Sequence, residues 1–248
     1  MPDPLHQFEL HRYLPINIGG WDLSFTNSAF YMLLATLLTL AFFYIATQAR
    51  ALVPGRMQSL AEVTYEFVAN MVHESMGKGG MRFFPFVFAI FIFTFACNML
   101  GMIPFAFTPT SHVAVTAALA LLVFVTVIVA GFAKNGMRFL KLFWPSGIPI
   151  AVMPLIVLIE VISFFARPVS HSIRLFANML AGHIALKVFG GFVVMLLGAG
   201  GIASALVPLP LLMAIALTAL EVLVAFIQAY VFAMLTSLYL NDALHPGH

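Results

Sequence analysis

The sequence predicts an all-α polytopic membrane protein, and three observations lead to this fold class. The chain of 248 residues is 62% hydrophobic and only 8% charged, whereas a soluble domain carries about 25% charged residues. Its mean hydropathy is +1.06. Several uncharged apolar stretches reach the ~20 residues that a helix needs to cross a bilayer core. We therefore expect a single membrane domain over residues 1–248, with three conventional spans, an interfacial amphipathic helix, and a long tilted helical hairpin near the C-terminus.

The composition excludes several classes of function. The single cysteine, Cys97, allows neither an internal disulfide nor a cysteine-based metal cluster. The net charge of +2 is small, and nothing in the sequence indicates nucleic-acid binding. Histidines in the two tails lack a third ligand at metal-binding spacing. No metal and no cofactor are therefore expected.

Three stretches are expected to cross the membrane as ordinary helices: residues 26–47, 83–107 and 112–132. They follow a polar and aromatic outer tail at residues 1–25. Asn98 lies inside the second stretch, where a lone amide most often makes a hydrogen bond to a neighbouring helix.

Residues 57–76 are expected to form an amphipathic helix at the membrane interface. The polar face of this helix is acidic, so attraction to lipid headgroups is not its obvious purpose. We interpret that face either as solvated or as a docking surface for a partner. Six apolar positions fall on the opposite broad face: Leu60, Val63, Phe67, Val68, Met71 and Val72.

The distribution of basic residues predicts the orientation. Loops 48–82 and 133–146 carry four and three Lys or Arg residues, whereas loop 105–112 carries none. By the positive-inside rule, the two basic loops face the cytoplasm or matrix. The N-terminus is then outside and the C-terminus inside.

The last hundred residues depart from this simple pattern, because the apolar stretch 147–194 is too long for one upright span. As a helix it would be roughly 70 Å long, against a bilayer core of about 30 Å. Either it breaks, near Pro154 or Pro168, or it runs strongly tilted. A glycine cluster at 197–203 predicts a turn, after which a second long helix returns over residues 207–240.

If the turn centres near residue 201, the register of the two antiparallel limbs can be read from the sequence. Each opposed pair offers a partner to a polar group that would otherwise be stranded in an apolar setting. The pairs expected are Arg174 with Gln228, His183 with Glu221, and Glu160 with Asp242.

One helical face of the first limb is expected to be polar. At about 100° per residue, its members fall within about 60° of one another. His183 lies on the opposite side, so either the helix bends near Gly182 or His183 belongs to a separate path. The members of the stripe are Glu160, Arg167, His171, Arg174 and Asn178.

Arg174 is the centre of this arrangement, because arginine stays charged wherever it is placed. A charge at mid-bilayer costs roughly 2.5–3.5 kcal/mol on insertion scales. Its expected neighbour, Gln228, is neutral. We therefore infer that an acidic residue in a partner's transmembrane helix supplies the counter-ion.

Glu and His can exchange protons near physiological pH, whereas Arg cannot. Two half-paths separated by a fixed positive charge would move protons without a direct leak. The proton path is expected to include His183, Glu221, Glu160, Asn178 and Gln228, with Asn98, His171 and Ser170 as secondary polar positions. Each also has a structural interpretation: a buried pair for His183 and Glu221, an interfacial carboxylate for Glu160, and hydrogen-bonding contacts for the amides.

Three stretches resemble the a subunit of F-type ATP synthases, most closely mitochondrial and alphaproteobacterial members. They are RPVSHSIRLFANMLAGH at 167–183, EVLVAFIQAYVFAMLTSLYL at 221–240 and NMLGMIP at 98–104. The resemblance implies a stator subunit that offers two offset proton half-channels to a rotating ring of c subunits.

The resemblance also implies residue roles. Arg174 matches the family's essential arginine, which faces a carboxylate of the ring. His183 and Glu221 match the outer half-channel pair, although the order of proton acceptance between them stays open. Glu160 matches a carboxylate toward the inner half-channel, and Asn178 and Gln228 lie near the arginine.

The expected partners are the c-subunit ring, peripheral-stalk b-type subunits and the lipid bilayer of a bacterial or mitochondrial inner membrane. The chain is not expected to be an enzyme itself, because it has no GxxxxGK[ST] nucleotide motif. Two alternatives are a self-contained proton-coupled secondary transporter and a structural membrane anchor. The transporter is less favoured, since no internal repeat is evident.

Overall fold

The computed structural model describes residues 10–15, 17–18, 21–22, 24–48, 54–103, 106–144 and 152–245. Helices dominate these residues, and five of them are long and apolar enough to cross a membrane. The expected all-α membrane fold class is thus confirmed. Within the described residues, strands occur only as short N-terminal pairs: β1 (Arg12–Leu14) pairs antiparallel with β4 (Phe25–Thr26), and β2 (Asn17–Ile18) with β3 (Trp21–Asp22).

The first three apolar helices are α1 (Asn27–Gln48), α3 (Phe84–Gly101) and α4 (Val113–Asn135). Helix α3 ends six residues before the expected limit of 107. Prolines at 104 and 109 follow it, and proline cannot continue a helical ladder. A short 3-10 turn, η3 (Pro109–Ser111), leads into α4.

Three further helical segments flank the apolar helices α3 and α4. After α4, Gly136 takes a positive φ of 53°, and the 3-10 segment η4 (Gly136–Phe143) follows. Before α3 lie the 3-10 segment η2 (Lys78–Phe83) and helix α2 (Arg56–Met76).

The buried face of α2 differs from the expected apolar face. Its buried residues are Ala61, Val68, Met71, Val72 and Met76. Leu60, Val63 and Phe67, expected on the same packed side, are exposed. The apolar face of α2 is wider than the part of the helix that packs against its neighbours, so some apolar side chains stay exposed. Exposed apolar side chains are typical of a helix that lies at a membrane interface.

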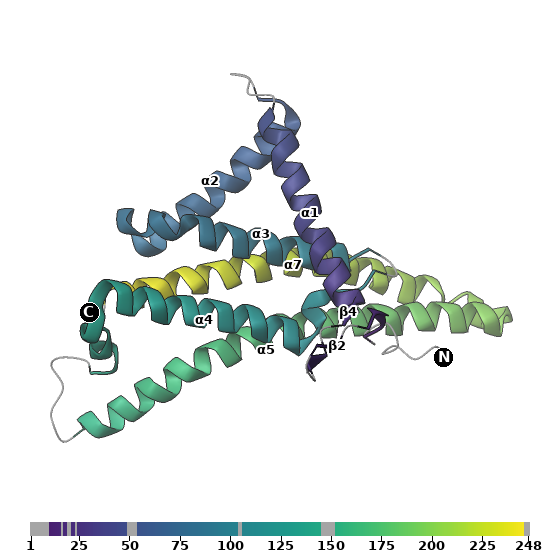
Figure 1. The fold of residues 1–248 in the computed structure, drawn as a ribbon. Coiled ribbons are helices and arrows are strands. Elements are labelled where there is room, and N and C mark those ends of the chain that lie inside the picture. Colours follow the sequence, from purple (N-terminus) through teal and green to yellow (C-terminus); the bar gives the residue numbers. More distant parts are fainter. Residues whose placement is uncertain are drawn as a thin grey trace. The chain divides into compact units, whose positions relative to one another are not determined.

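The two long helices are α5 (Met153–Ala199) and α7 (Pro208–Leu244) (Figure 1). Helix α5 continues through Pro168, so a break at this residue is wrong. Proline removes one backbone hydrogen bond there, which a membrane helix tolerates when its surroundings compensate. Pro154 falls in the first turn, where a missing N–H costs nothing.

The connection between the long helices lies slightly later than expected. Helix α5 includes the first three residues of the glycine cluster and ends at Ala199. Gly200 and Gly201 then take positive φ values of 64° and 58°, a conformation that only glycine adopts without strain. The four-residue α6 (Gly201–Ser204) completes the turn before α7.

The chain divides into two compact units, each with its own core. The first unit comprises Met1–Phe42, Phe93–His112 and Leu175–Ala229; the second comprises Phe43–Ile92, Val113–Arg174 and Tyr230–His248. Fully buried side chains in the first include Asn98 and Leu175, and in the second Phe91, Val123 and Leu240. The single membrane domain inferred from the sequence stays a prediction.

Candidate functional site

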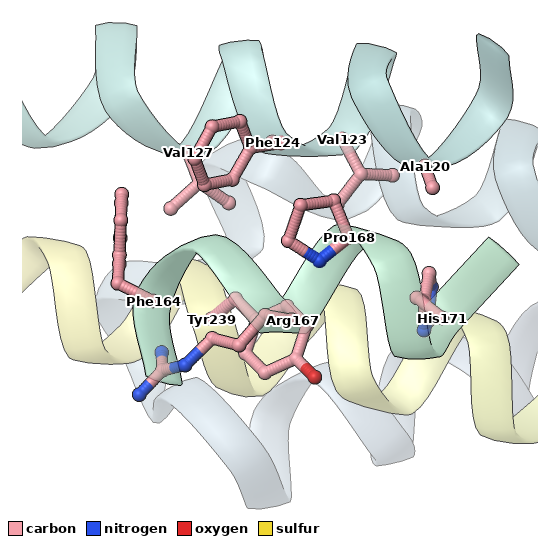
Figure 2. Close-up of a pocket in the computed structure, with 9 residues that line it drawn as sticks. All are labelled: Ala120, Val123, Phe124, Val127, Phe164, Arg167, Pro168, His171 and Tyr239. Carbon is pink, nitrogen blue, oxygen red and sulfur yellow. The ribbon is translucent and has the colours of Figure 1, made fainter. Parts of the chain in front are cut away.

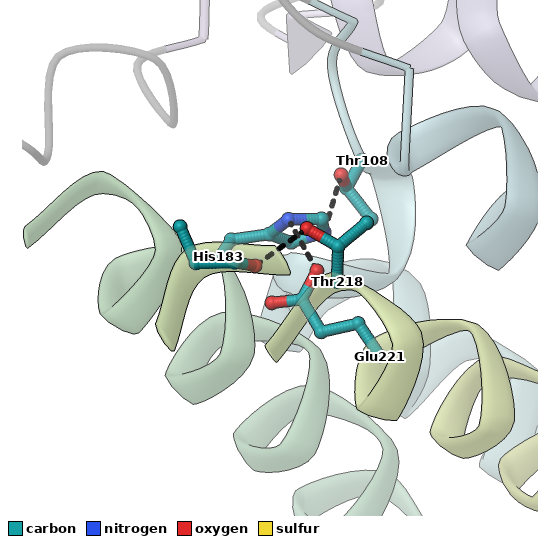
Figure 3. Close-up of polar contacts among 5 residues, drawn as sticks. Thr108, His183, Thr218 and Glu221 are labelled. Atoms are coloured by element: carbon teal, nitrogen blue, oxygen red, sulfur yellow. Dashed lines mark hydrogen bonds and ion pairs between the residues drawn. The ribbon is translucent and has the colours of Figure 1, made fainter. Parts of the chain in front are cut away.

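His183 and Glu221 meet inside the first unit, as the hairpin register predicts. Nδ1 of His183 lies 3.7 Å from Oε2 of Glu221, and the two side chains are 11% and 8% exposed. Figure 3 shows the imidazole from α5 and the carboxylate from α7 turned toward each other. Two groups that can each take up and release a proton are thus placed together away from bulk solvent.

The local sequence explains how the carboxylate reaches this position. Gly182 lies beside it, and a Cβ built there would meet Oε1 of Glu221 at 2.5 Å and Cδ at 3.0 Å. The absence of a side chain at Gly182 therefore creates the space that Glu221 occupies. Both carboxylate oxygens are buried, and neither accepts a hydrogen bond from the described part of the chain.

A hydroxyl lies on the far side of the His183 ring. Oγ1 of Thr108, just before η3, is 3.0 Å from Nε2 of His183 (Figure 3). Thr108 is 2% exposed. The imidazole is therefore held between a hydroxyl at Nε2 and a carboxylate at Nδ1.

Asn98 makes the interhelical hydrogen bonds expected of a lone buried amide. Its Nδ2 donates to the carbonyl of Ala225 in α7 at 3.3 Å, and its Oδ1 accepts from Oγ1 of Thr110 at 2.7 Å. Both Asn98 and Thr110 are fully buried. This network connects α3, the turn after it and α7 one helical turn beyond Glu221.

Arg174 lies in the middle of α5, and its side chain is exposed. Among the described acidic residues of its own unit, none forms an ion pair with it. Asn178, one turn later, is also exposed, whereas Gln228 in α7 is buried. The side chains beside Arg174 on its exposed face are small: Ser170, Ala177 and Ala181.

The expected pairing of Glu160 with Asp242 is wrong. Asp242 instead accepts a hydrogen bond from Nη1 of Arg167 at 3.0 Å, which makes an ion pair. The guanidinium also lies over the ring of Tyr239, 5.0 Å from its centroid. The physical reason is charge: two carboxylates repel, whereas arginine is long enough to reach the acid. Glu160 is partly exposed near the start of α5.

His171 and its neighbours belong to the packed side of α5, so the polar stripe is not uniformly exposed. The ring of His171 is buried and lies 3.7 Å, between centroids, from that of Phe232. Ser172 is buried against Thr116, with their hydroxyl oxygens 3.0 Å apart, while Ser170 is exposed.

A cavity of about 10 Å³ lies beside Pro168 in the second unit. Figure 2 shows the side chains that line it, which come from α4, α5 and α7 and include Arg167, His171 and Tyr239. Its volume suits about one water molecule, which is too small for a transported solute.

Thr108 and Thr110 were not among the residues selected from the sequence. They lie in the motif FTPTSH at 107–112, a short uncharged turn between two apolar spans. The available signal was three hydroxyl residues in that turn, since hydroxyls at membrane depth need partners. The sequence of the turn does not predict which residues these hydroxyls bind, because a loop has no regular periodicity that fixes its neighbours.

Comparison with known proteins gives one consistent result. A family model described as ATP synthase A chain matches residues 29–241. The ATP synthase subunit a of Mesorhizobium japonicum is 60% identical over 248 residues, covering 99% of this chain and 98% of that protein. That of Nitrobacter hamburgensis is 60% identical over 251 residues, covering 100% of both.

A third relative, the ATP synthase subunit a of Maricaulis maris, is 59% identical over 254 residues, covering 99% of this chain and 98% of that protein. These relatives are alphaproteobacterial, in agreement with the resemblance found in the sequence, and none of the three is named as a transporter. Because the family model matches most of the chain and the relatives match it from end to end, this chain belongs to the ATP synthase subunit a family.

Proposed function

We propose that this chain is the non-catalytic stator subunit of a rotary ATP synthase and carries protons along two offset half-paths to a ring of c subunits. The observation that carries the proposal is the buried pair of His183 and Glu221, 3.7 Å apart, in a chain whose central arginine, Arg174, is exposed. The pair would form part of the outer half-path. Glu160 would serve the inner half-path, with Asn178 and Gln228 near the arginine.

The exposed face around Arg174 supports a partner helix at this position. Ser170, Ala177, Asn178 and Ala181 share that face and are exposed, and small residues let helices approach closely in membranes. A carboxylate on the approaching helix would be held ionised beside Arg174 by Coulomb attraction. When the carboxylate moves away from Arg174, it can take up a proton from one half-path. As a neutral acid it can then travel with the rotating ring past the surrounding lipid.

The remaining expectations belong to the same proposal. The long helix α5 measures roughly 70 Å, so it would lie strongly tilted beside the ring in a core about 30 Å thick. Peripheral-stalk b-type subunits would hold the chain still. The complex would occupy the inner membrane, with the N-terminus outside and the C-terminus inside.

The proposal is tested by replacing the two arginines of α5 separately in the complete ATP synthase. Arg174→Ala should abolish proton-driven ATP synthesis in proteoliposomes, because the ring carboxylate loses its charged partner. Arg167→Ala is the matched control, since Arg167 is already paired with Asp242, and it should retain most of the activity. Normal proton-driven ATP synthesis in Arg174→Ala would contradict the proposal.

The position of the ring is tested by cysteine cross-linking. In a Cys97→Ser background, Ser170→Cys and Ala177→Cys should form disulfides with a cysteine introduced in the outer helix of subunit c. Leu175→Cys, buried in this chain, should not. Equal cross-linking from Leu175→Cys would contradict the proposed ring-facing surface.

A further inference from the structure

In the segment that joins α3 to α4, the side chain of Thr108 contacts His183 of the buried His183–Glu221 pair. Oγ1 of Thr108 lies 3.0 Å from Nε2 of His183, and the opposite ring nitrogen, Nδ1, lies 3.7 Å from Oε2 of Glu221. The hydroxyl and the carboxylate therefore bracket the imidazole from two elements that are far apart in the sequence (Figure 3).

Thr108 is itself held in place by its own turn. Its carbonyl accepts hydrogen bonds from the backbone N–H of Ser111 at 3.1 Å and from Oγ of Ser111 at 2.7 Å. In α3, a Cβ at Gly101 would overlap the side chain of Thr108, so the close approach depends on glycine. A hydroxyl this constrained can direct the ring that it binds.

The same turn is also connected to the helix that carries the carboxylate. Thr110 donates to Asn98 at 2.7 Å, and Asn98 donates to the carbonyl of Ala225 at 3.3 Å. Ala225 lies one helical turn after Glu221. The turn thus contacts α5 through His183 and is linked to α7 near Glu221, so it can hold both members of the pair in register.

We propose that Thr108 is a positioning residue for His183, an inference that rests on the proposed function and deepens it. A threonine hydroxyl can donate or accept a hydrogen bond by rotating about its C–O bond. It can donate to Nε2 when that nitrogen is unprotonated and accept from it when the imidazole is charged. The ring therefore keeps Nδ1 toward Glu221 in both states, without turning each time a proton passes.

The test uses the complete ATP synthase in proteoliposomes driven by an imposed proton gradient. Thr108→Val keeps the shape and removes the hydroxyl, and Thr108→Ser restores the hydroxyl. Thr218→Val is the matched control, because among the described residues the hydroxyl of Thr218 bonds to its own helix, donating to the carbonyl of Ala214 at 2.9 Å. The amount of this chain in each purified complex is measured alongside the rate.

Thr108→Val should lower the rate of ATP synthesis roughly three- to tenfold, the change that loss of one ordinary hydrogen bond produces. Thr108→Ser should stay within about twofold of the parent rate, since it keeps that bond, and Thr218→Val should match the parent. A parent-like rate in Thr108→Val overturns the inference. So does an equal loss in Thr108→Ser, because packing rather than the hydroxyl would then be responsible.

Gly101→Ala is the second variant if Thr108→Val fails to assemble. It leaves every polar group in place but pushes the Thr108 side chain away, so it should show the same loss; a parent-like rate in the assembled complex overturns the inference. His183→Ala distinguishes the proposed function of the His183–Glu221 pair from the role of Thr108. If His183→Ala retains synthesis, the proposed function of the pair fails. If it abolishes synthesis while Thr108→Val does not lower it, only the role of Thr108 fails.

Discussion

Adding one methyl group at Gly182 should separate His183 from Glu221. In Gly182→Ala the new Cβ would lie 2.5 Å from Oε1 of Glu221, 3.0 Å from Cδ and 3.1 Å from Cγ. An ordinary carbon–oxygen contact is about 3.3 Å or longer. The carboxylate must therefore shift by about 0.8 Å to relieve the contact, and it can do so because it ends a flexible side chain.

This shift is large compared with the geometry that it disturbs. Nδ1 of His183 and Oε2 of Glu221 are only 3.7 Å apart, and a misplacement of about 1 Å can cost roughly a hundredfold in rate. We expect Gly182→Ala to lower proton-driven ATP synthesis about ten- to hundredfold. The helix itself should gain about 0.5–1 kcal/mol, because alanine is the better helix former, so lost activity would not reflect an unstable α5.

The assay is ATP synthesis by the purified complex in proteoliposomes, with ATP hydrolysis by the detached catalytic sector as a measure of intact catalysis. Gly190→Ala and Gly191→Ala are the controls, since both glycines lie on α5 and a Cβ at either would meet nothing within 4 Å. Synthesis at the parent rate in the Gly182→Ala complex would contradict the prediction. An equal loss of ATP synthesis in Gly190→Ala would contradict it as well, because the loss would then come from a stiffer helix and not from the displaced Glu221 carboxylate.

Three further predictions concern other contacts. The swap His183→Glu with Glu221→His should retain more ATP synthesis than either single change, because it keeps one acid and one imidazole at the site; a double variant no better than the worse single change would contradict the direct pair. Asn98→Leu should destabilise the chain by about 1–2 kcal/mol, because it removes two buried hydrogen bonds. The measurement is thermal unfolding in detergent, and the control is Thr36→Val, whose exposed hydroxyl donates to its own helix. Equal shifts of the unfolding temperature in both variants would argue against the Asn98 network. Asp242→Asn should cost less than about 1 kcal/mol, because the ion pair with Arg167 is partly exposed, and should leave synthesis within about twofold of the parent; complete loss of synthesis would place Asp242 on the proton path instead.

The accuracy of the hairpin register depends on distance from the turn. His183 and Glu221, the expected pair nearest the glycine cluster, do meet. Glu160 and Asp242, the farthest pair, do not, and Asp242 binds Arg167 instead. A register counted from the turn assumes an ideal helical rise along both limbs, so any departure from that rise matters more for a pair farther from the turn. Far from the turn, charge complementarity then selects the partner.

The class of fold, the existence of the long helices and the residues that could exchange protons can all be predicted from the amino-acid sequence. Those properties follow from hydropathy and from periodicity along a single helix, which act between near neighbours in the chain. Three other features come from the packing of the folded chain: α5 continues through Pro168, one part of the apolar face of α2 is buried, and Thr108 contacts His183. Each of these depends on what a neighbouring element offers: a compensating environment for a lost hydrogen bond, a packing surface, or a polar atom at 3.0 Å. No pattern within one segment carries that information, because the partner comes from a distant part of the chain.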